Sequence, residues 1–182
     1  MAPFVILIKM LYMIGGPPRM GKSTLAQKLL AEQSLPYVST DALTVMLKPL
    51  GEPSFYSPEK SARLFPLLEL FIMRMLKSSP NYVIEGDAFS PHHVSELQNK
   101  YDVKAVFLTM SKVSTDAVIR FAQFDNWASE DTPKQLEDLA ARIVAASEVI
   151  KEECEHFSIP HFDLSSDYAT NFERAYKLLV DN

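Results

Sequence analysis

The residues with the clearest chemical meaning form one short glycine-containing loop near the start of the chain. The segment Gly16-Pro17-Pro18-Arg19-Met20-Gly21-Lys22-Ser23 matches G-x-x-x-x-G-K-[ST] at every fixed position. In this pattern, glycines let successive backbone N–H groups turn toward an anion, and the helix that follows adds its positive N-terminal end. The loop therefore predicts a site for the phosphates of a nucleotide.

Two side chains at the end of this loop have predicted roles of their own. Lys22 is expected to reach the β- and γ-phosphates, and the Ser23 hydroxyl lies where Mg²⁺ must sit. The alternative is a tight turn that only joins a strand to a helix, which would require neither side chain. No G-x-G-x-x-G follows any predicted strand, which argues against a dinucleotide-binding domain. The residues predicted to bind the nucleotide are Gly16, Pro17, Pro18, Arg19, Met20, Gly21, Lys22, Ser23 and Thr24.

Acidic residues follow a second apolar segment, which reads Tyr-Val-Ile-Glu-Gly-Asp over residues 82–87. Ligands of open α/β sheets gather at the carboxyl ends of the strands. Glu85 is therefore predicted to hold Mg²⁺ directly or through a water, and Gly86 to let substrate or backbone come close. The alternative is a carboxylate that caps a turn.

Asp41 ends another such segment, Val38-Ser39-Thr40-Asp41, and by the same argument lies opposite the phosphate loop. It is predicted to orient a substrate hydroxyl or to accept its proton during phosphoryl transfer. The alternative is an N-cap for a helix over residues 42–48, and both roles can hold together. Asp87 is a second candidate for the base.

Short apolar runs alternate with longer helical patterns along the chain, which favours an α/β sandwich with a parallel sheet covered on both faces. The predicted strands cover residues 11–14, 37–39, 82–85, 104–109 and 161–163. The predicted helices cover residues 22–33, 58–77, 91–100, 115–125, 132–155 and 171–180. Residues 40–58, which hold three prolines, and the polar residues 126–133 are predicted to be irregular, as binding loops and lids often are.

Composition limits the classes of function. The 182 residues fit one domain, and a formal charge of −5 argues against a dedicated nucleic-acid-binding module. A single cysteine, Cys154, excludes an internal disulfide framework and a cysteine zinc cluster, and is predicted to be an ordinary thiol. Three of only five glycines, Gly15, Gly16 and Gly21, fall in the phosphate loop or next to it, which indicates unusual backbone geometry there.

The first fourteen residues are apolar but too short for a membrane span, and a glycine-rich loop follows where a secretory signal would need a cleavage site. Two interpretations of residues 1–9 stay open. They lengthen the first strand, or Met10 is the natural start and they are an upstream extension. Both predict a cytoplasmic protein without a membrane partner.

On these residues the chain resembles the P-loop kinase group that includes adenylate kinase and shikimate kinase. The resemblance rests on the phosphate loop, on Asp41 and on Glu85-Gly86, and the coarse topology extends it over most of the chain. Residues 84–87 with Pro91 are also similar to a region of 2-phosphoglycerate-kinase-like proteins. The resemblance implies a three-layer α/β/α sandwich with a five-stranded parallel sheet, ATP with Mg²⁺, an acceptor site under residues 40–77 and a closing lid.

In such kinases the lid supplies arginines that follow the transferring phosphoryl group. Here residues 126–133 contain no Arg or Lys, which departs from the family pattern. Arg120, before this predicted lid hinge, is therefore the predicted catalytic arginine, and Arg142 follows the hinge; a solvated helix face is the alternative for Arg120. Arg19 is a second source of positive charge.

Several further residues have a functional reading beside a plainer one. An arginine of the long apolar helix would either clamp a carboxylate or phosphate or be solvated. The histidine pair after Pro91 is interpreted as a solvent-exposed helix start, in preference to a metal site. An aromatic side chain in the hinge would stack on adenine or pack the lid, and a polar segment after the last strand would hold the nucleotide base. These residues are Arg63, Arg74, His92, His93, Trp127, Ser165, Ser166 and Asp167.

Together these features predict an ATP-dependent phosphotransferase that moves the γ-phosphoryl group to a hydroxyl, phosphate or carboxylate of a small molecule. The alternative is a nucleotide-binding switch or assembly module without a small-molecule acceptor, and a third reading is a relic that only binds nucleotide. The predicted partners are a nucleoside triphosphate and a small acceptor. The sequence leaves open the acceptor, the choice of ATP over GTP and the oligomeric state.

Overall fold

The computed structural model describes residues 9–47, 58–78, 81–113 and 132–181. Within them, five parallel strands form one sheet in the order β2-β3-β1-β4-β5. The predicted five-stranded parallel sheet is confirmed, and each observed strand contains its predicted run. The strands are β1 (Met10–Gly15), β2 (Tyr37–Ser39), β3 (Asn81–Gly86), β4 (Asp102–Thr109) and β5 (His161–Asp163).

Helices follow the strands in the described residues. They are α1 (Lys22–Gln33), α2 (Thr40–Leu47), α3 (Pro58–Ser78), α4 (Pro91–Gln98), α6 (Pro133–Phe157) and α7 (Tyr168–Val180). The bounds of α1 match the prediction, and α3, α4, α6 and α7 differ from it by a few residues at their ends. The predicted helix over residues 115–125 and most of the predicted hinge lie outside the described residues, as do residues 1–8.

The prediction that residues 40–58 are irregular is wrong for the first part of that segment, which forms α2. The prolines that suggested irregular structure stand at positions 49, 53 and 58, so none of them interrupts this helix. The Ser39 hydroxyl accepts the backbone N–H of Asp41 at 3.2 Å, as a residue just before a helix does. Residues 48–57 lie outside the described part of the chain.

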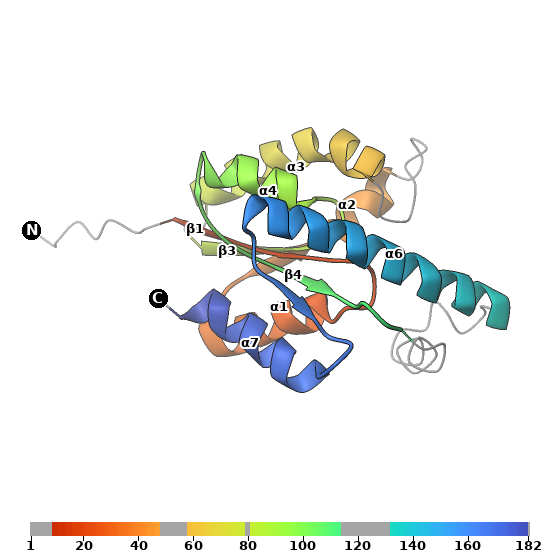
Figure 1. The fold of residues 1–182 in the computed structure, drawn as a ribbon. Helices are drawn as coiled ribbons and strands as arrows, with labels where there is room; N and C mark the ends of the chain where they lie inside the picture. The colour runs from red at the N-terminus through yellow and green to blue at the C-terminus, as the bar shows by residue number, and fades with distance from the viewer. Residues whose placement is uncertain (1–8, 48–57, 79–80, 114–131, 182) are drawn as a thin grey trace, which may run out of the picture.

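The sheet is covered on both faces, as Figure 1 shows: α1 and α7 lie on one side, and α3, α4 and α6 lie on the other. Side chains of β1 alternate between the two layers. Leu11 and Met13 pack with the cluster under α3, α4 and α6, while Ile14 packs with the cluster under α1 and α7. This three-layer arrangement buries the central strands on both sides and holds their carboxyl ends rigidly.

The register of the sheet decides which residues meet at its carboxyl edge. β3 lies between β2 and β1, so Glu85 is the register partner of Ser39 on one side and of Ile14 on the other. Because the strands are parallel, the loop that follows β1 and the helix that follows β2 both begin beside the end of β3. The topology therefore brings three segments, far apart in sequence, to one place.

Candidate nucleotide-binding and phosphoryl-transfer site

The loop after β1 has the backbone geometry that its sequence predicted. Gly16 has φ +135°, and a Cβ built at this position would lie 2.1 Å from the carbonyl oxygen of Leu108 in β4. Arg19 also has a positive φ, +67°, which is uncommon for a residue with a side chain. The chain thus turns sharply against β4 before α1 begins, and glycine is required at position 16.

The N-terminus of α1 lacks the caps seen at other helix starts. Its N-cap residue is Gly21, no side-chain capping bond is present among the described residues, and its first turn carries no acidic residue. By contrast, Ser90, Thr132 and Asp167 cap α4, α6 and α7 through their side chains. Uncapped N–H groups and the positive end of the helix dipole favour an anion at this position.

Lys22, the lysine of the motif, is held against the loop. Its ammonium Nζ donates a 2.7 Å hydrogen bond to the carbonyl oxygen of Pro17, and the residue is only 7% exposed. Met20 is buried beside it and anchors the loop in the core under α1. A cation and several backbone N–H groups thus belong to one short segment, as phosphate binding requires.

The two predicted metal-binding side chains meet. The Ser23 hydroxyl donates a 3.0 Å hydrogen bond to Oε1 of Glu85. Glu85 is 1% exposed, and its other oxygen, Oε2, is buried without a hydrogen-bond partner among the described residues. A buried carboxylate oxygen left unsatisfied beside a serine hydroxyl is a suitable donor set for Mg²⁺, so these residues fit the ion that the motif implies.

Burial is the main cause of a raised pKa at Glu85, because it disfavours the charged form of the carboxyl group. The charge of Lys22 and the hydroxyls of Ser39 and Ser23 oppose this shift, while the charge of Asp41 adds to it. The same result shows that all four groups lie near Glu85. The structure therefore brings the phosphate loop, Asp41 and Glu85 together at the carboxyl edge of the sheet.

Asp41 lies in the first turn of α2 with an exposed side chain, where its charge suits the helix dipole. Ser39 has a capping contact at this helix start, because its hydroxyl accepts the backbone N–H of Asp41. Asp87, the second candidate for the base, directly follows β3 and is buried. Asp41 is thus the more accessible of the two carboxylates to an acceptor entering from solvent.

Gly86 permits a close approach, as predicted, but the group that approaches is a side chain of this protein. Gly86 has φ +144°, and a Cβ there would lie 1.8 Å from the Thr40 hydroxyl oxygen. Thr40 is fully buried at the start of α2. This contact fixes α2 against the end of β3, and with it the position of Asp41.

Other predicted residues lie elsewhere or have structural roles. Arg120 and Trp127 lie outside the described residues. Arg63, Arg74 and Arg142 have exposed side chains. Arg74 donates to the hydroxyl of Ser78 at the far end of α3, which agrees with the solvated alternative.

The histidine pair does not lie wholly in solvent, so that prediction is wrong for His93. His93 is 8% exposed, stacks on Phe65 with ring centroids 4.1 Å apart, and accepts the backbone N–H of Ser90 at Nδ1. Burial, together with the neighbouring His92, lowers the pKa of His93 to about 4. His93 completes a capping box with Ser90 at a position where glutamate or glutamine is usual. This unusual residue type explains why the sequence did not indicate the capping role of His93.

Cys154 is buried in the core under α3, α4 and α6. Burial and the nearby charges of Glu153 and Glu155 raise the pKa of its thiol to about 12. A protonated, enclosed thiol is a poor nucleophile, which agrees with the ordinary thiol predicted from the sequence.

Sequence reasoning missed a carboxylate that joins the ends of β4 and β5. Burial opposes ionisation of Asp163, but hydrogen bonds from Ser111 and Ser165 outweigh it and lower the pKa to about 2. The backbone N–H groups of Ser111 and Ser165 donate to Asp163 Oδ1 at 3.2 and 2.9 Å. The segment predicted to hold a nucleotide base is therefore fixed by this network, and Asp167 caps α7. No spacing rule connects these residues in the sequence.

Tyr168 is a second residue that sequence reasoning missed. It opens α7, stacks on Phe172 with ring centroids 5.6 Å apart, and places its hydroxyl 2.3 Å from where a Cβ at Gly21 would lie. The last helix thus packs directly on the phosphate loop. A lone tyrosine after a capping residue gives no signal of such a contact.

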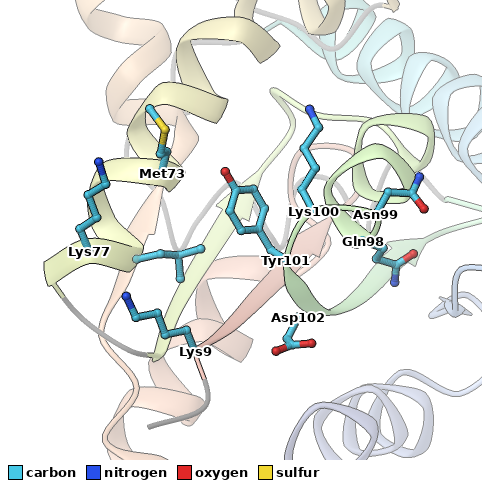
Figure 2. A pocket seen from close by; sticks show the side chains of 9 residues that line it. Lys9, Met73, Lys77, Gln98, Asn99, Lys100, Tyr101 and Asp102 are labelled. Carbon is cyan, nitrogen blue, oxygen red and sulfur yellow. The ribbon is translucent and has the colours of Figure 1, made fainter. Parts of the chain in front are cut away.

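A pocket of about 510 Å³ lies at the opposite edge of the sheet from the phosphate loop. Figure 2 shows Lys9, Lys77, Lys100, Tyr101 and Asp102 around it, where β1 and β4 begin and α3 ends. Lys77 lies in the last turn of α3, and Lys100 follows α4 and pairs with Glu69 at 2.6 Å. Cations are favourable at helix C-termini, so this positive charge has a structural explanation.

The described residues contain no cluster of three or more His, Cys, Asp or Glu side chains that could hold a metal ion. The pair of Ser23 and Glu85 offers a hydroxyl and a single carboxylate instead. In the same part of the chain, no helix has both the length and the apolar character needed to cross a bilayer.

Comparisons with known proteins agree at the level of fold. No family model and no curated protein sequence matches the chain. A solved gluconokinase from Sinorhizobium meliloti 1021 is similar with a TM-score of 0.56 and 16% identity, over 94% of this chain and 92% of that one. A shikimate kinase from Bacteroides thetaiotaomicron has a TM-score of 0.51 and 16% identity, over 92% and 94%. An uncharacterized protein from Eubacterium ventriosum ATCC 27560 has a TM-score of 0.55 and 14% identity, over 96% and 99%.

These similarities cover nearly the whole of each chain, so they concern the complete fold rather than the phosphate loop alone. Identities this low show a shared fold and leave activity to be argued from the site. The chain has a P-loop small-molecule-kinase-like fold, with its phosphate loop after the central strand of a five-stranded parallel sheet.

Proposed function

We propose that this protein is an ATP-dependent phosphotransferase that moves the γ-phosphoryl group of Mg·ATP to a small-molecule acceptor. The observation that carries the proposal is the contact between Ser23 and Glu85 at the uncapped start of α1. Ser23 directly follows Lys22, the lysine of the motif, and its partner Glu85 is buried with one oxygen that has no hydrogen-bond partner among the described residues. Nucleotide phosphates and a divalent cation together would use all of these groups.

The residues of the loop would bind and orient the donor. Backbone N–H groups of Gly16–Ser23 and the start of α1 would hold the β- and γ-phosphates, and Lys22 would exchange its bond to the Pro17 carbonyl for phosphate oxygens. Mg²⁺ held by Ser23 and Glu85 would neutralise charge on these oxygens. Donors aligned before the reaction stabilise the charge that moves to the leaving oxygen.

Asp41 would act on the acceptor. A hydroxyl beside it would attack the γ-phosphorus, forming a new O–P bond while the bond from that phosphorus to the β–γ bridging oxygen breaks. The hydroxyl proton passes to the Asp41 carboxylate, and ADP leaves with the bridging electron pair. Asp41 is exposed at the edge where the loop ends, which supports this role. Arg120 stays a proposed second cation for the transferring group.

The test is a nucleotide-consumption screen. ADP formation from Mg·ATP is measured with panels of hydroxylated metabolites, nucleosides and nucleoside monophosphates, with Asp41→Asn as a comparison variant. Stimulation by one acceptor class, lost in Asp41→Asn, is the expected result. Slow ADP formation that no acceptor stimulates would contradict a kinase and favour the switch reading.

A further inference from the structure

A small pocket of about 170 Å³ lies between α2 and α3. Seven of its eight lining residues are apolar, and they come from α2, from α3 and from Ala88, just after β3. Leu64 and Leu68 are buried at 5% and 2% exposure, whereas Leu67 and Met46 are 52% and 74% exposed. The pocket therefore has a closed apolar floor and an apolar rim open to solvent.

Among the described residues, the lining of this pocket offers no free hydrogen-bond donor. Its one polar lining residue is Thr44, whose hydroxyl donates to the backbone carbonyl of Thr40 at 3.1 Å. A polyhydroxylated ligand entering this space would lose hydrogen bonds to water without replacing them, which is costly. A hydrocarbon group would lose none, and it would cover the exposed side chains of the rim.

The pocket adjoins the candidate site. Ala88 stands two residues after Gly86, against which Thr40 packs. Asp41 precedes Thr44 by three residues on α2, which places them about one helical turn apart. A ligand with a hydroxyl near Asp41 therefore has this pocket within reach of its remaining atoms.

We propose that the acceptor carries a hydrocarbon group next to its reacting hydroxyl, and that this group sits in the pocket between α2 and α3. The inference rests on the proposed kinase function and names its substrate class. A cavity of about 150 Å³ lined by apolar side chains accommodates benzene. The group therefore has about the size of a six-carbon ring or a short branched chain.

The exposed leucines of α3 supply a matched pair of variants. Leu67 lines the pocket at 52% exposure, and Leu70 is 58% exposed on the same helix but does not line it. Leu67→Gln and Leu70→Gln therefore make the same chemical change on similar solvent-exposed positions. Thermal unfolding of both variants checks that neither has lost its fold.

The experiment measures ADP formation from Mg·ATP with benzyl alcohol, cyclohexylmethanol and glycerol. Stimulation by the two apolar alcohols above that by glycerol is expected. Leu67→Gln should lower kcat/KM for them roughly tenfold, the scale of a lost methylene contact, while Leu70→Gln leaves it unchanged. Saturation-transfer NMR with benzyl alcohol should show the same difference in binding without reference to turnover.

Four results would overturn the inference. Glycerol that stimulates as well as the apolar alcohols would leave the kinase proposal standing and reject the hydrocarbon group. Equal effects of the two variants on kcat/KM would mean that the pocket does not bind the acceptor. A dimer of the parent that both variants dissociate in sedimentation would mean that the apolar surface is an interface between two copies of the chain. If no acceptor stimulates ADP formation, either in this experiment or in the metabolite screen, the kinase function is rejected and the inference with it.

Discussion

The hydroxyl of Ser23 donates a 3.0 Å hydrogen bond to Oε1 of Glu85, a residue 62 positions further along the chain. Ser23 is the second residue of α1, the helix after β1, and Glu85 lies near the end of β3, a strand that pairs with β1. The contact links the phosphate loop to the end of β3, where the Glu85 carboxylate is buried. It is therefore the structural basis of the proposed magnesium site.

Glu85→Gln should separate stability from ligand binding. The substitution keeps the shape of the side chain and replaces a buried carboxyl group, whose pKa is raised by burial, with a neutral amide. The apoprotein variant should therefore unfold at pH 7 at the same temperature as the parent or at a higher one. Mg·AMPPNP should stabilise the parent by about 2.7 kcal/mol at a hundred times its Kd, and the variant by clearly less. Thermal unfolding with and without the ligand measures both effects. Equal stabilisation of the two proteins would exclude Glu85 from the metal site.

The pH dependence of the apoprotein follows from the same shift. Because the folded state raises the pKa of Glu85, it holds the proton more tightly than the unfolded chain does. This contribution to stability is present at low pH and is lost as pH rises from the ordinary value of 4.5 through the raised pKa. The stability advantage of Glu85→Gln over the parent should therefore grow with pH across that window.

Gly86→Ala should lower the free energy of unfolding by about 2–5 kcal/mol, because it combines an unfavourable φ with a steric overlap. Its methyl group would lie 1.8 Å from the Thr40 hydroxyl oxygen. That oxygen is buried without a hydrogen-bond partner among the described residues, so Thr40→Ala removes the closest contact and breaks no hydrogen bond shown there, while the Cβ of residue 40 stays 2.9 Å from the added methyl group.

The double variant tests this contact. Gly86→Ala combined with Thr40→Ala should lose at least about 1 kcal/mol less than the sum of the single variants, since the methyl group that Gly86→Ala adds overlaps the hydroxyl oxygen that Thr40→Ala removes. Denaturant unfolding of the four proteins gives the coupling. Additivity within about 0.5 kcal/mol would show that the two residues do not interact in this way.

The sequence predicted the parts of the fold that local patterns determine. The apolar runs identified the five strands of the described residues, and the predicted helix over residues 132–155 begins within one residue of the observed start of α6. The phosphate-loop motif predicted Ser23 as a metal ligand. The position of Glu85 at the end of a predicted strand made it the second predicted ligand, and the contact between the two residues supports both predictions. A nearby proline-rich segment led to the wrong prediction for α2, because the helix ends before the first of those prolines.

Contacts between distant segments could not be predicted, because no spacing connects their residues. The bonds between Asp163 and Ser111 depend on the pairing of β4 with β5, and the contact of Tyr168 with Gly21 depends on how α7 packs on α1. The stacking of His93 on Phe65 likewise needs the position of α3. Each of these contacts depends on tertiary packing, which cannot be read from the local sequence pattern around either residue.

His93 should make the protein less stable in mild acid. Folding lowers its pKa to about 4, so its neutral form contributes stability that is present above pH 6.5 and is lost as pH falls toward 4. Between these values, the free energy of unfolding should decrease by up to about 1.4 kcal/mol per pH unit from this group.

His93→Gln is the matched control, because glutamine can complete the same capping box and does not titrate. Denaturant unfolding at pH 7, 6 and 5 should show a steeper loss of stability in the parent than in the variant. Parallel pH profiles would mean that His93 is accessible to protons in the folded state.

The central claim is that the loop from Gly16 to Ser23 holds the phosphates of a magnesium nucleotide, with Lys22 as its cation. Isothermal titration with Mg·AMPPNP tests it most directly, on the parent, on Lys22→Ala and on Lys22→Met, which keeps the aliphatic stem of this buried residue. The parent should bind one nucleotide per chain. Both variants should keep the fold by circular dichroism, bind at least about tenfold more weakly, and lose acceptor-stimulated turnover by a hundredfold or more, roughly the effect of losing one transition-state donor. A parent that does not bind at millimolar nucleotide, or variants that bind as tightly as the parent, would contradict the claim.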